Sequence, residues 1–272
     1  MSDKMKNLLV RTASGVVLAA VIFAAVLWSR WSFVALLALL TVGGMSEFYA
    51  LARKCGSTPQ PVIGTVAGLA LLAIPVFLSE NLGLCGLLAL LLLLPASFIC
   101  ALWSKSAHPI ADLGATLLGV VYVAFPFACA ACCSHADDKL PVLGYILIIW
   151  ANDVCAYLVG LAVGRHPLFP RLSPKKSWEG FFGGIAGAVC VGLLLARFTD
   201  GTYAAWAGLA LIAAVTGVAG DLVESMFKRA AGVKDSGALI PGHGGVLDRF
   251  DSMIWVAALL DLIVRWVSAI SK

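Results

Sequence analysis

Long apolar runs separated by short polar connections extend along almost the whole chain. Nine of these runs approach the roughly 20 residues that a helix needs to cross the hydrocarbon of a bilayer. The runs are Thr12–Trp28, Trp31–Leu51, Pro61–Leu78, Leu82–Trp103, Leu113–Cys133, Leu140–Gly160, Gly180–Phe198, Ala204–Gly220 and Met253–Ala269. The pattern predicts an all-α fold, a polytopic bundle of about nine transmembrane helices.

The composition agrees with a membrane protein, because 61% of the 272 residues are hydrophobic and the mean hydropathy is +0.97. The first apolar run follows Lys4, Lys6 and Arg11, and in this respect it resembles a secretory signal peptide. The eight further runs behind it favour an uncleaved first helix.

Basic residues are divided unequally between the two sides that nine spans would define, with fourteen on the N-terminal side and five on the other. Lys and Arg accumulate on the cytoplasmic side of membrane proteins. The imbalance therefore predicts a protein of the cytoplasmic (inner) membrane whose N-terminus and C-terminal polar loops face the cytoplasm. The net charge of +4 follows from this topology and from contact with anionic lipid, and it gives no indication of nucleic-acid binding.

One polar stretch, residues 221–252, stands between two long apolar runs and holds nine charged residues among its 32. Its first half has helical spacing, because Asp221, Ser225 and Lys228 fall at i, i+4 and i+7. Its second half is rich in glycine and proline, which favour a turning backbone. Four basic and five acidic residues suit a site that binds a divalent cation and phosphate together. A solvated loop between two spans is the alternative that composition leaves open.

The polar stretch closely resembles the signature of the phosphatidate cytidylyltransferases, also called CDP-diacylglycerol synthases. The resemblance rests on Ser225, Lys228-Arg229, Lys234-Asp235, residues 241–245 (PGHGG) and residues 248–251 (DRFD), at the spacing of that family. A second block, residues 173–180 (SPKKSWEG), preceded by Asp153, Ala156 and Tyr157, is similar to another segment of the family. The family often has a basic residue where this chain has Leu161, and whether Arg165 replaces it is left open.

The resemblance implies an enzyme, a nucleotidyltransferase of phospholipid biosynthesis. Its substrates would be CTP and phosphatidic acid, and its products CDP-diacylglycerol and pyrophosphate. Mg²⁺ is the implied cofactor, a second cation is left open, and a homodimer is the implied assembly. We expect the N-terminal transmembrane helices, residues 1–135, to provide scaffold and lipid access, and residues 136–272 to form the catalytic region.

The resemblance also assigns roles to individual residues. Asp221 and Asp248 match the family's metal-binding aspartates, and Asp251 is expected either to support these ligands without binding the ion directly or to bind a second cation. The residues expected to be catalytic, through contacts with phosphate, are Lys228, Arg229, His243 and Arg249. The residues expected to bind substrate are Asp153, Ser173, Lys175, Lys176, Ser177, Ser225 and Lys234.

Other functions use similar sequence features. A CTP-dependent lipid kinase, such as a polyprenol kinase, would have similar charges and spans but would transfer the γ-phosphoryl group to an alcohol. A secondary transporter or lipid-binding protein would show broken helices at the bilayer midplane and repeat symmetry, whereas the polar groups here gather at the cytoplasmic end. The spaced Asp-Gly and Ala-Arg pattern of CDP-alcohol phosphotransferases is absent.

Two features outside the polar stretch carry expectations of their own. Glu47 falls near the cytoplasmic end of the second run, where an exposed carboxylate is expected to snorkel or to pair with Arg53 or Lys54. A role in shaping the lipid entrance is the alternative. The seventh run has glycines at i, i+4 spacing, Gly180 with Gly184 and Gly183 with Gly187, which predicts close helix contact in the core or at a dimer face.

Overall fold

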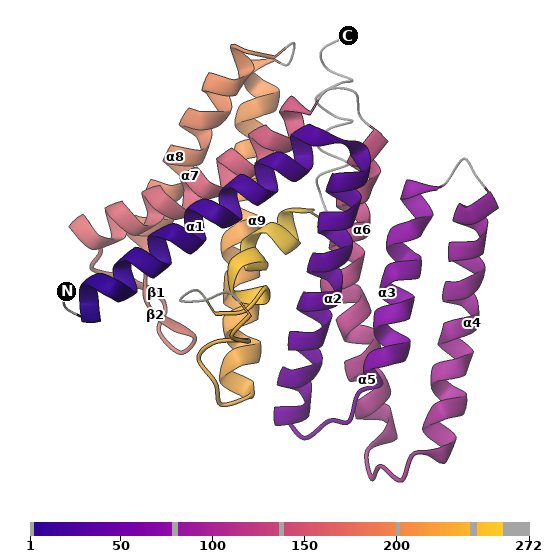
Figure 1. Ribbon diagram of the computed structural model, residues 1–272. Coiled ribbons are helices and arrows are strands. Elements are labelled where there is room, and N and C mark those ends of the chain that lie inside the picture. The colour runs from indigo at the N-terminus through magenta and orange to yellow at the C-terminus, as the bar shows by residue number, and fades with distance from the viewer. Residues whose placement is uncertain (1–2, 78–80, 136–138, 200–201, 240–243, 258–272) are drawn as a thin grey trace. The chain divides into compact units, whose positions relative to one another are not determined.

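The computed structural model describes residues 3–77, 81–135, 139–199, 202–239 and 244–257. Within them the chain is almost entirely helical, which confirms the predicted all-α class (Figure 1). The elements in chain order are α1 (Asp3–Trp28), α2 (Arg30–Lys54), α3 (Pro61–Val76), α4 (Asn81–Trp103), α5 (Pro109–Gly119), the π-helical turn η1 (Val120–Ala124), α6 (Phe125–Cys132), the 3-10 turn η2 (Cys133–His135), α7 (Leu140–Val163), β1 (Pro167–Phe169), β2 (Ser173–Ser177), α8 (Trp178–Ala196) and α9 (Tyr203–Ala230).

Within the described residues, six helical segments are long and apolar enough to cross a membrane, judged by length and composition. They are Arg30–Lys54, Gly83–Trp103, Pro109–His135, Leu140–Val163, Trp178–Ala196 and Tyr203–Ala230. The apolar segments Thr12–Trp28 and Pro61–Val76 are shorter. Most of the ninth expected run, Met253–Ala269, lies outside the described residues. The structure therefore supports a helical membrane protein but does not confirm the count of nine spans.

The chain divides into two compact units. Unit 1 comprises Met1–His135 and Phe227–Phe250, and unit 2 comprises Ala136–Met226 and Asp251–Lys272. The chain passes from unit 2 to unit 1 near the end of α9 and returns after Phe250. Residues 227–250 thus group with the N-terminal helices, and the predicted division of roles at residue 135 stays a prediction.

Tyr49 of α2 is at the centre of unit 1, where its side chain is fully buried. Its hydroxyl donates a hydrogen bond to the backbone carbonyl of Thr116 in α5, over 2.9 Å. Gly64 of α3 and Gly119 of α5 lie against the phenol ring, and a Cβ atom at Gly119 would stand 2.6 Å from it. The two glycines let the backbones of α3 and α5 approach a large aromatic side chain at the density of a packed core.

An aromatic cluster joins the start of residues 227–250 to the rest of unit 1. Phe227 packs edge-on against Phe48 of α2 and Tyr122 of η1, with ring centroids 5.6 and 5.1 Å apart. Edge-to-face contacts of this kind are favourable because the ring edge is positive and the ring face negative. The polar segment that follows Phe227 therefore starts from a fixed point within unit 1.

Local sequence accounts for where several helices of unit 1 begin and bend. Ser29 caps α2 through its side chain, and Pro61 and Pro109 occupy first-turn positions of α3 and α5, where a missing N–H costs nothing. The π-helical turn η1 ends where the N–H of Phe125 donates to the carbonyl of Val120, just before Pro126. Pro126 itself stands in the first turn of α6, where a residue without an N–H is tolerated.

Unit 2 is organised by the contact between α7 and α8, which lie along each other through small residues. A Cβ atom at Gly184 would stand 2.6 Å from the side-chain oxygen of Asn152, and one at Gly180 would stand 2.8 Å from the carbonyl oxygen of Ala156. The close contact predicted from the glycine spacing is confirmed as packing inside the unit. Trp206 of α9 is also fully buried in this unit.

Candidate functional site

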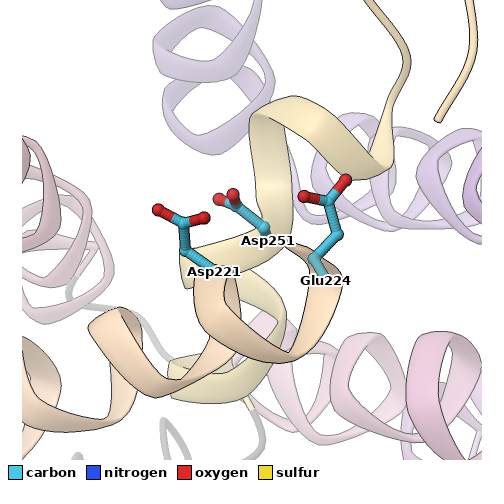
Figure 2. A group of neighbouring side chains, drawn as sticks. All are labelled: Asp221, Glu224 and Asp251. Carbon is cyan, nitrogen blue, oxygen red and sulfur yellow. The ribbon is translucent and has the colours of Figure 1, made fainter. Parts of the chain in front are cut away.

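Three carboxylates gather in unit 2 (Figure 2). Asp221 and Glu224 lie one turn apart on α9, and Asp251 belongs to the helical residues 247–257. One oxygen from each side chain lies within 4.8 Å of the other two. Gly220 permits this approach, because a Cβ atom there would stand 2.6 Å from the carbonyl oxygen of Asp251. We refer to these three side chains as the carboxylate cluster.

The carboxylate cluster has a cation and a hydroxyl beside it. Lys176, in β2, forms an ion pair with Asp221, and the Ser225 hydroxyl donates to the other Asp221 oxygen over 3.3 Å. Burial, followed by the negative charges of Asp221 and Glu224, raises the pKa of Asp251 well above its usual value. Negative charge is therefore concentrated here beyond what Lys176 alone balances.

The donor set of the carboxylate cluster fits a divalent cation. Mg²⁺ prefers carboxylate, water and phosphate oxygens, and a bound cation would relieve the repulsion that raises the pKa of Asp251. Asp221 and Asp251, both assigned to the metal site from the sequence, belong to this set. Glu224, which is fully buried, is a third member that the sequence did not single out for this role.

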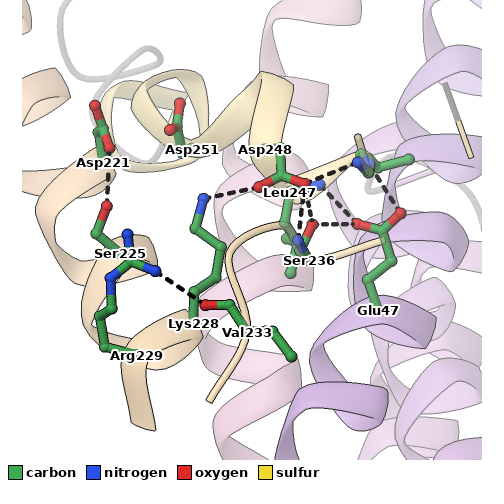
Figure 3. Close-up of polar contacts among 12 residues, drawn as sticks. Glu47, Asp221, Ser225, Lys228, Arg229, Val233, Ser236, Leu247, Asp248 and Asp251 are labelled. Atoms are coloured by element: carbon green, nitrogen blue, oxygen red, sulfur yellow. Dashed lines mark hydrogen bonds and ion pairs between the residues drawn. The ribbon is translucent and has the colours of Figure 1, made fainter. Parts of the chain in front are cut away.

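Asp248, the other predicted metal ligand, lies in unit 1 and is held by hydrogen bonds there (Figure 3). Its Oδ1 accepts from the ammonium group of Lys228 over 2.7 Å. Its Oδ2 accepts from the backbone N–H groups of Ser236 and Gly245, each over 2.8 Å. The expected pairing of Asp221 with Asp248 at one metal ion stays a prediction.

The pKa of Asp248 reflects two opposing effects. Burial acts to raise it, but the hydrogen bond from Lys228 and those from the backbone of Gly245 and Ser236 favour the charged form. The balance lowers the pKa of Asp248 to about 2. Asp248 is therefore a carboxylate at any physiological pH, and its side chain is only 5% exposed.

The remaining basic residues of the predicted site differ in exposure. Lys228 is largely buried beside Asp248, whereas Arg229 is exposed and donates to the carbonyl of Val233 over 3.1 Å. Lys234 and Arg249 are also exposed. His243, predicted to contact phosphate, lies outside the described residues.

The second predicted block, residues 173–180, forms β2 and the first turn of α8, and β2 pairs with β1 as an antiparallel hairpin. Ser177 caps α8, because its hydroxyl oxygen accepts a hydrogen bond from the N–H of Gly180 over 3.1 Å. Lys175 is exposed, and Ser173 is half-buried at the beginning of β2. Asp153 of α7 lies close enough to Lys176 and Asp221 to interact with both electrostatically. In unit 2 the structure thus brings together predicted residues from α7, β2, α9 and the helical residues 247–257.

Glu47 differs from its prediction. The side chain is only 8% exposed, so the expected exposed carboxylate is wrong, and no ion pair with Arg53 or Lys54 occurs among the described residues. Instead, Glu47 accepts hydrogen bonds from the N–H groups of Val246 and Leu247 over 2.8 and 2.9 Å. Arg53 and Lys54 were expected as partners because they are close to Glu47 in sequence. Val246 and Leu247 are about 200 positions away, so sequence spacing could not indicate them.

Ser236 is a further residue that sequence reasoning missed. It is buried, and its hydroxyl lies 2.9 Å from a carboxylate oxygen of both Glu47 and Asp248. A hydroxyl has one proton, so the Ser236 side chain donates to one of the two carboxylates at a time. The Ser236 backbone N–H donates to Asp248 in either case. The only available signal was its position, next to Asp235 of the signature and before Gly237.

Comparison with known proteins gives a family and named relatives. The model of the cytidylyltransferase family matches residues 9–267. Curated relatives called phosphatidate cytidylyltransferase include one from Staphylococcus aureus (strain COL), 41% identical over 167 residues, and one from Staphylococcus haemolyticus (strain JCSC1435), 39% identical over 163 residues. Each alignment covers 59% of this chain and 62% of the relative. The chain thus spans a little less than two thirds of the length of these relatives.

Proposed function

Because this chain belongs to the cytidylyltransferase family, we propose that it transfers the cytidylyl group of CTP to phosphatidic acid. Two relatives named phosphatidate cytidylyltransferase, 41% and 39% identical over the aligned part, support this choice of substrates. The structural observation that carries the proposal is the carboxylate cluster with Lys176 beside it. Opposite charges at one place suit a cation together with the phosphates of a nucleotide.

In the proposed reaction, an oxygen of the lipid phosphomonoester attacks the α-phosphorus of CTP. A new P–O bond forms as the bond from the α-phosphorus to the oxygen of the β-phosphate breaks, and pyrophosphate leaves in line. The nucleophile is already an anion, so the reaction has little need of a general base. The main task of the protein is to hold two polyanions together and to neutralise their charge.

Basic side chains on two elements would perform this neutralisation. We assign Lys175 and Lys176, on β2, to the triphosphate, and Lys228 and Arg229, in the last turns of α9, to the lipid phosphate or to pyrophosphate. Lys234, Arg249 and His243 are assigned to the same phosphates. Residues assigned to other contacts with the nucleotide are Asp153, Ser173, Ser177 and Ser225.

We propose Mg²⁺ as the cofactor, held by Asp221, Asp251 and Glu224, with Asp248 as the partner of Asp221 that the family signature implies. When bound, Mg²⁺ neutralises phosphate charge and orients phosphate oxygens. The assignment of Asp248 is tested by the Asp248→Asn variant. Full magnesium-dependent activity in that variant would remove Asp248 from the metal site.

The proposed location of the active site follows from the nature of the two substrates. CTP is soluble in the cytoplasm, and the phosphate of phosphatidic acid lies at the membrane surface, so a site at the cytoplasmic ends of the helices would be accessible to both. We therefore propose that the protein lies in the cytoplasmic membrane with its N-terminus and polar loops in the cytoplasm, in agreement with the distribution of basic residues. A homodimer is proposed from the family alone.

The test of function is a labelling experiment with purified protein in detergent. The protein is incubated with phosphatidic acid, Mg²⁺ and CTP labelled at either the α- or the γ-phosphate, and the lipid fraction is counted. Cytidylyl transfer places label in the lipid from α-labelled CTP only, with release of pyrophosphate.

The other outcomes distinguish the rival functions. Label in the lipid from γ-labelled CTP would identify a lipid kinase. An absence of label from both forms, in protein that still binds CTP, would argue for a binding or transport protein. Either result would overturn the proposed function.

A further inference from the structure

Glu47 is a buried carboxylate of the N-terminal helices that bonds to both ends of residues 236–247, which we call the signature segment. It belongs to α2, and its hydrogen-bond partners, Ser236, Val246 and Leu247, lie 189 to 200 positions later in the chain (Figure 3). Oε1 accepts from the Val246 N–H, and Oε2 accepts from the Leu247 N–H and faces the Ser236 hydroxyl. All four residues belong to unit 1.

The backbone is shaped to admit this carboxylate. A Cβ atom at Gly237 would stand 2.5 Å from Oε1 of Glu47, and a Cβ atom at Gly245 would collide with Oε2. Gly237 and Gly245, near the two ends of the signature segment, therefore both leave space for the Glu47 side chain. An incidental contact would not require a missing side chain at both positions.

The hydrogen bonds of Glu47 also cap the N-terminus of a helix. Residues 247–257 are helical, and the first N–H groups of a helix have no partner within it. Glu47 accepts from the N–H groups of Val246 and Leu247 and places a negative charge at the positive end of this helix. An N-terminal cap is normally supplied by a neighbouring residue, whereas here it comes from α2.

Through these contacts Glu47 is connected to Asp248. Asp248 follows Leu247 directly, and its Oδ2 accepts from the N–H groups of Ser236 and Gly245. Two of the three residues that hold Asp248 are therefore shared with Glu47 or adjacent to its partners: Ser236 contacts both carboxylates, and Gly245 precedes Val246. The third, Lys228, does not contact Glu47 among the described residues. A change at Glu47 would alter the backbone that immediately precedes Asp248 and the position of the Ser236 hydroxyl.

We propose that Glu47 is a positioning residue for cytidylyl transfer, which fixes the two ends of the signature segment and thereby the orientation of Asp248 toward Lys228. The proposal rests on the proposed function, because it gives Glu47 a part in that reaction. Glu47 itself does not contact substrate in this proposal. It acts through Ser236 and through the backbone of Val246 and Leu247.

The test compares Glu47→Gln with Asp112→Asn, a matched control. Asp112 is another buried carboxylate of unit 1, and it accepts two hydrogen bonds from Thr58, outside the signature segment. Each variant removes one buried charge without changing side-chain size. Hydrogen–deuterium exchange is measured in detergent, and we expect Glu47→Gln to raise exchange at residues 244–250 about 10-fold while Asp112→Asn leaves it unchanged.

Steady-state kinetics give the second readout, per mole of folded protein. Displacement of a positioned group slows the chemical step more than it weakens binding. We therefore expect Glu47→Gln to lower kcat by about 10- to 100-fold with KM for CTP changed by less than about 3-fold. Asp112→Asn should keep the wild-type kcat.

A second pair of variants covers the case in which Glu47→Gln does not fold. Gly237→Ala keeps the Glu47 residue but adds a methyl group that would displace its carboxylate. Gly114→Ala in α5 is the matched control, because the new methyl group there has open space around it. We expect the first to reproduce the exchange and kcat changes and the second to have no effect.

Two results would overturn the positioning role. One is a wild-type exchange rate and kcat in folded Glu47→Gln or Gly237→Ala. The other is a loss of activity that is equal in Glu47→Gln and Asp112→Asn and that is fully explained by a loss of folded protein in both variants. If the wild-type protein transfers no cytidylyl group, the proposed function fails, but the exchange comparison still decides whether Glu47 holds the segment.

Discussion

A carboxylate that leaves water must find donors or cations, and individual residues of this chain show several solutions. Asp248 has an ammonium group and two backbone N–H groups, and Glu47 has backbone N–H groups at a helix start. Asp221 has Lys176 and the Ser225 hydroxyl. Such bonds are among the stronger ones in proteins, and breaking them leaves a buried charge without compensation.

Asp248 gives a prediction of stability against pH. Its pKa is about 2 in the folded protein and about 3.9 in an unfolded chain, so its ionised form stabilises the fold by roughly 2 to 3 kcal/mol. This stabilisation is fully present above about pH 4 and is lost as the pH falls through about 2.

The corresponding measurement is thermal unfolding in detergent with a chelator present, for the wild type and for Asp248→Asn. At pH 7 the variant should unfold at a lower temperature, and the difference should shrink steadily below pH 4. A difference that stayed constant down to pH 2 would show that the charge of Asp248 is not what stabilises unit 1.

At the scale of elements, the second signature block combines a structural and a proposed substrate role at Ser177. Its hydroxyl oxygen caps α8, and the Cβ atom that Gly164 lacks would stand 2.7 Å from that oxygen. A cap of this kind contributes about 1 kcal/mol. The position of the helix that follows Lys175 and Lys176 therefore depends partly on this residue.

We expect Ser177→Ala to lower stability by about 1 kcal/mol and Ser177→Asn, which keeps a capping oxygen, to restore most of it. Thermal unfolding and activity are measured on both variants. If Ser177 acts only through the cap, activity will follow stability in both. An inactive but stable Ser177→Asn would instead support direct contact with the nucleotide.

The packing of α7 on α8 provides a second prediction for elements. A methyl group at Gly184 would stand 2.6 Å from the Asn152 side-chain oxygen and 2.9 Å from its carbonyl oxygen, and backbone cannot move aside cheaply. Gly184→Ala should therefore destabilise the protein by about 1–3 kcal/mol. Gly114→Ala is the control, since a helical glycine in open space gains up to about 1 kcal/mol from the change. Equal unfolding temperatures for the two variants would contradict the close contact.

Elements with local causes were predictable from the sequence. The helical spacing of Asp221 and Ser225 predicted the face on which they now share a hydrogen bond, and the glycine spacing predicted the contact of α8. Glu224 and Glu47 were not predicted, because their surroundings depend on tertiary packing. The hairpin was also missed, since its strands of three and five residues carry no alternating apolar pattern.

At the scale of the whole molecule, the resemblance to the family is confirmed, because the family model matches nearly the entire chain. The all-α membrane fold was predictable because long apolar runs need no tertiary information. The number of spans was harder to predict from the sequence, because an apolar run does not fix the length of its helix. α3 has only 16 residues, and the last apolar run lies largely outside the described residues.

Orientation is the prediction that belongs to this scale. Cys55, exposed just after α2, lies on the side expected to face the cytoplasm. In a variant that keeps Cys55 as its only cysteine, a membrane-impermeant thiol reagent should label inside-out vesicles and spare right-side-out ones. The reverse labelling would invert the proposed topology, and a cysteine engineered at Lys139 should behave oppositely.

The long sequence separation between Glu47 and its partners has a consequence for biosynthesis. A ribosome completes α2 well before it reaches Ser236, 189 positions later, so the nascent chain carries the Glu47 carboxylate without its native donors for most of translation. Ordering of this part of unit 1 must therefore wait for residues 236–247. A chain arrested after Met226 would contain α1 to α8 but would leave the Glu47 carboxylate without its native hydrogen-bond donors.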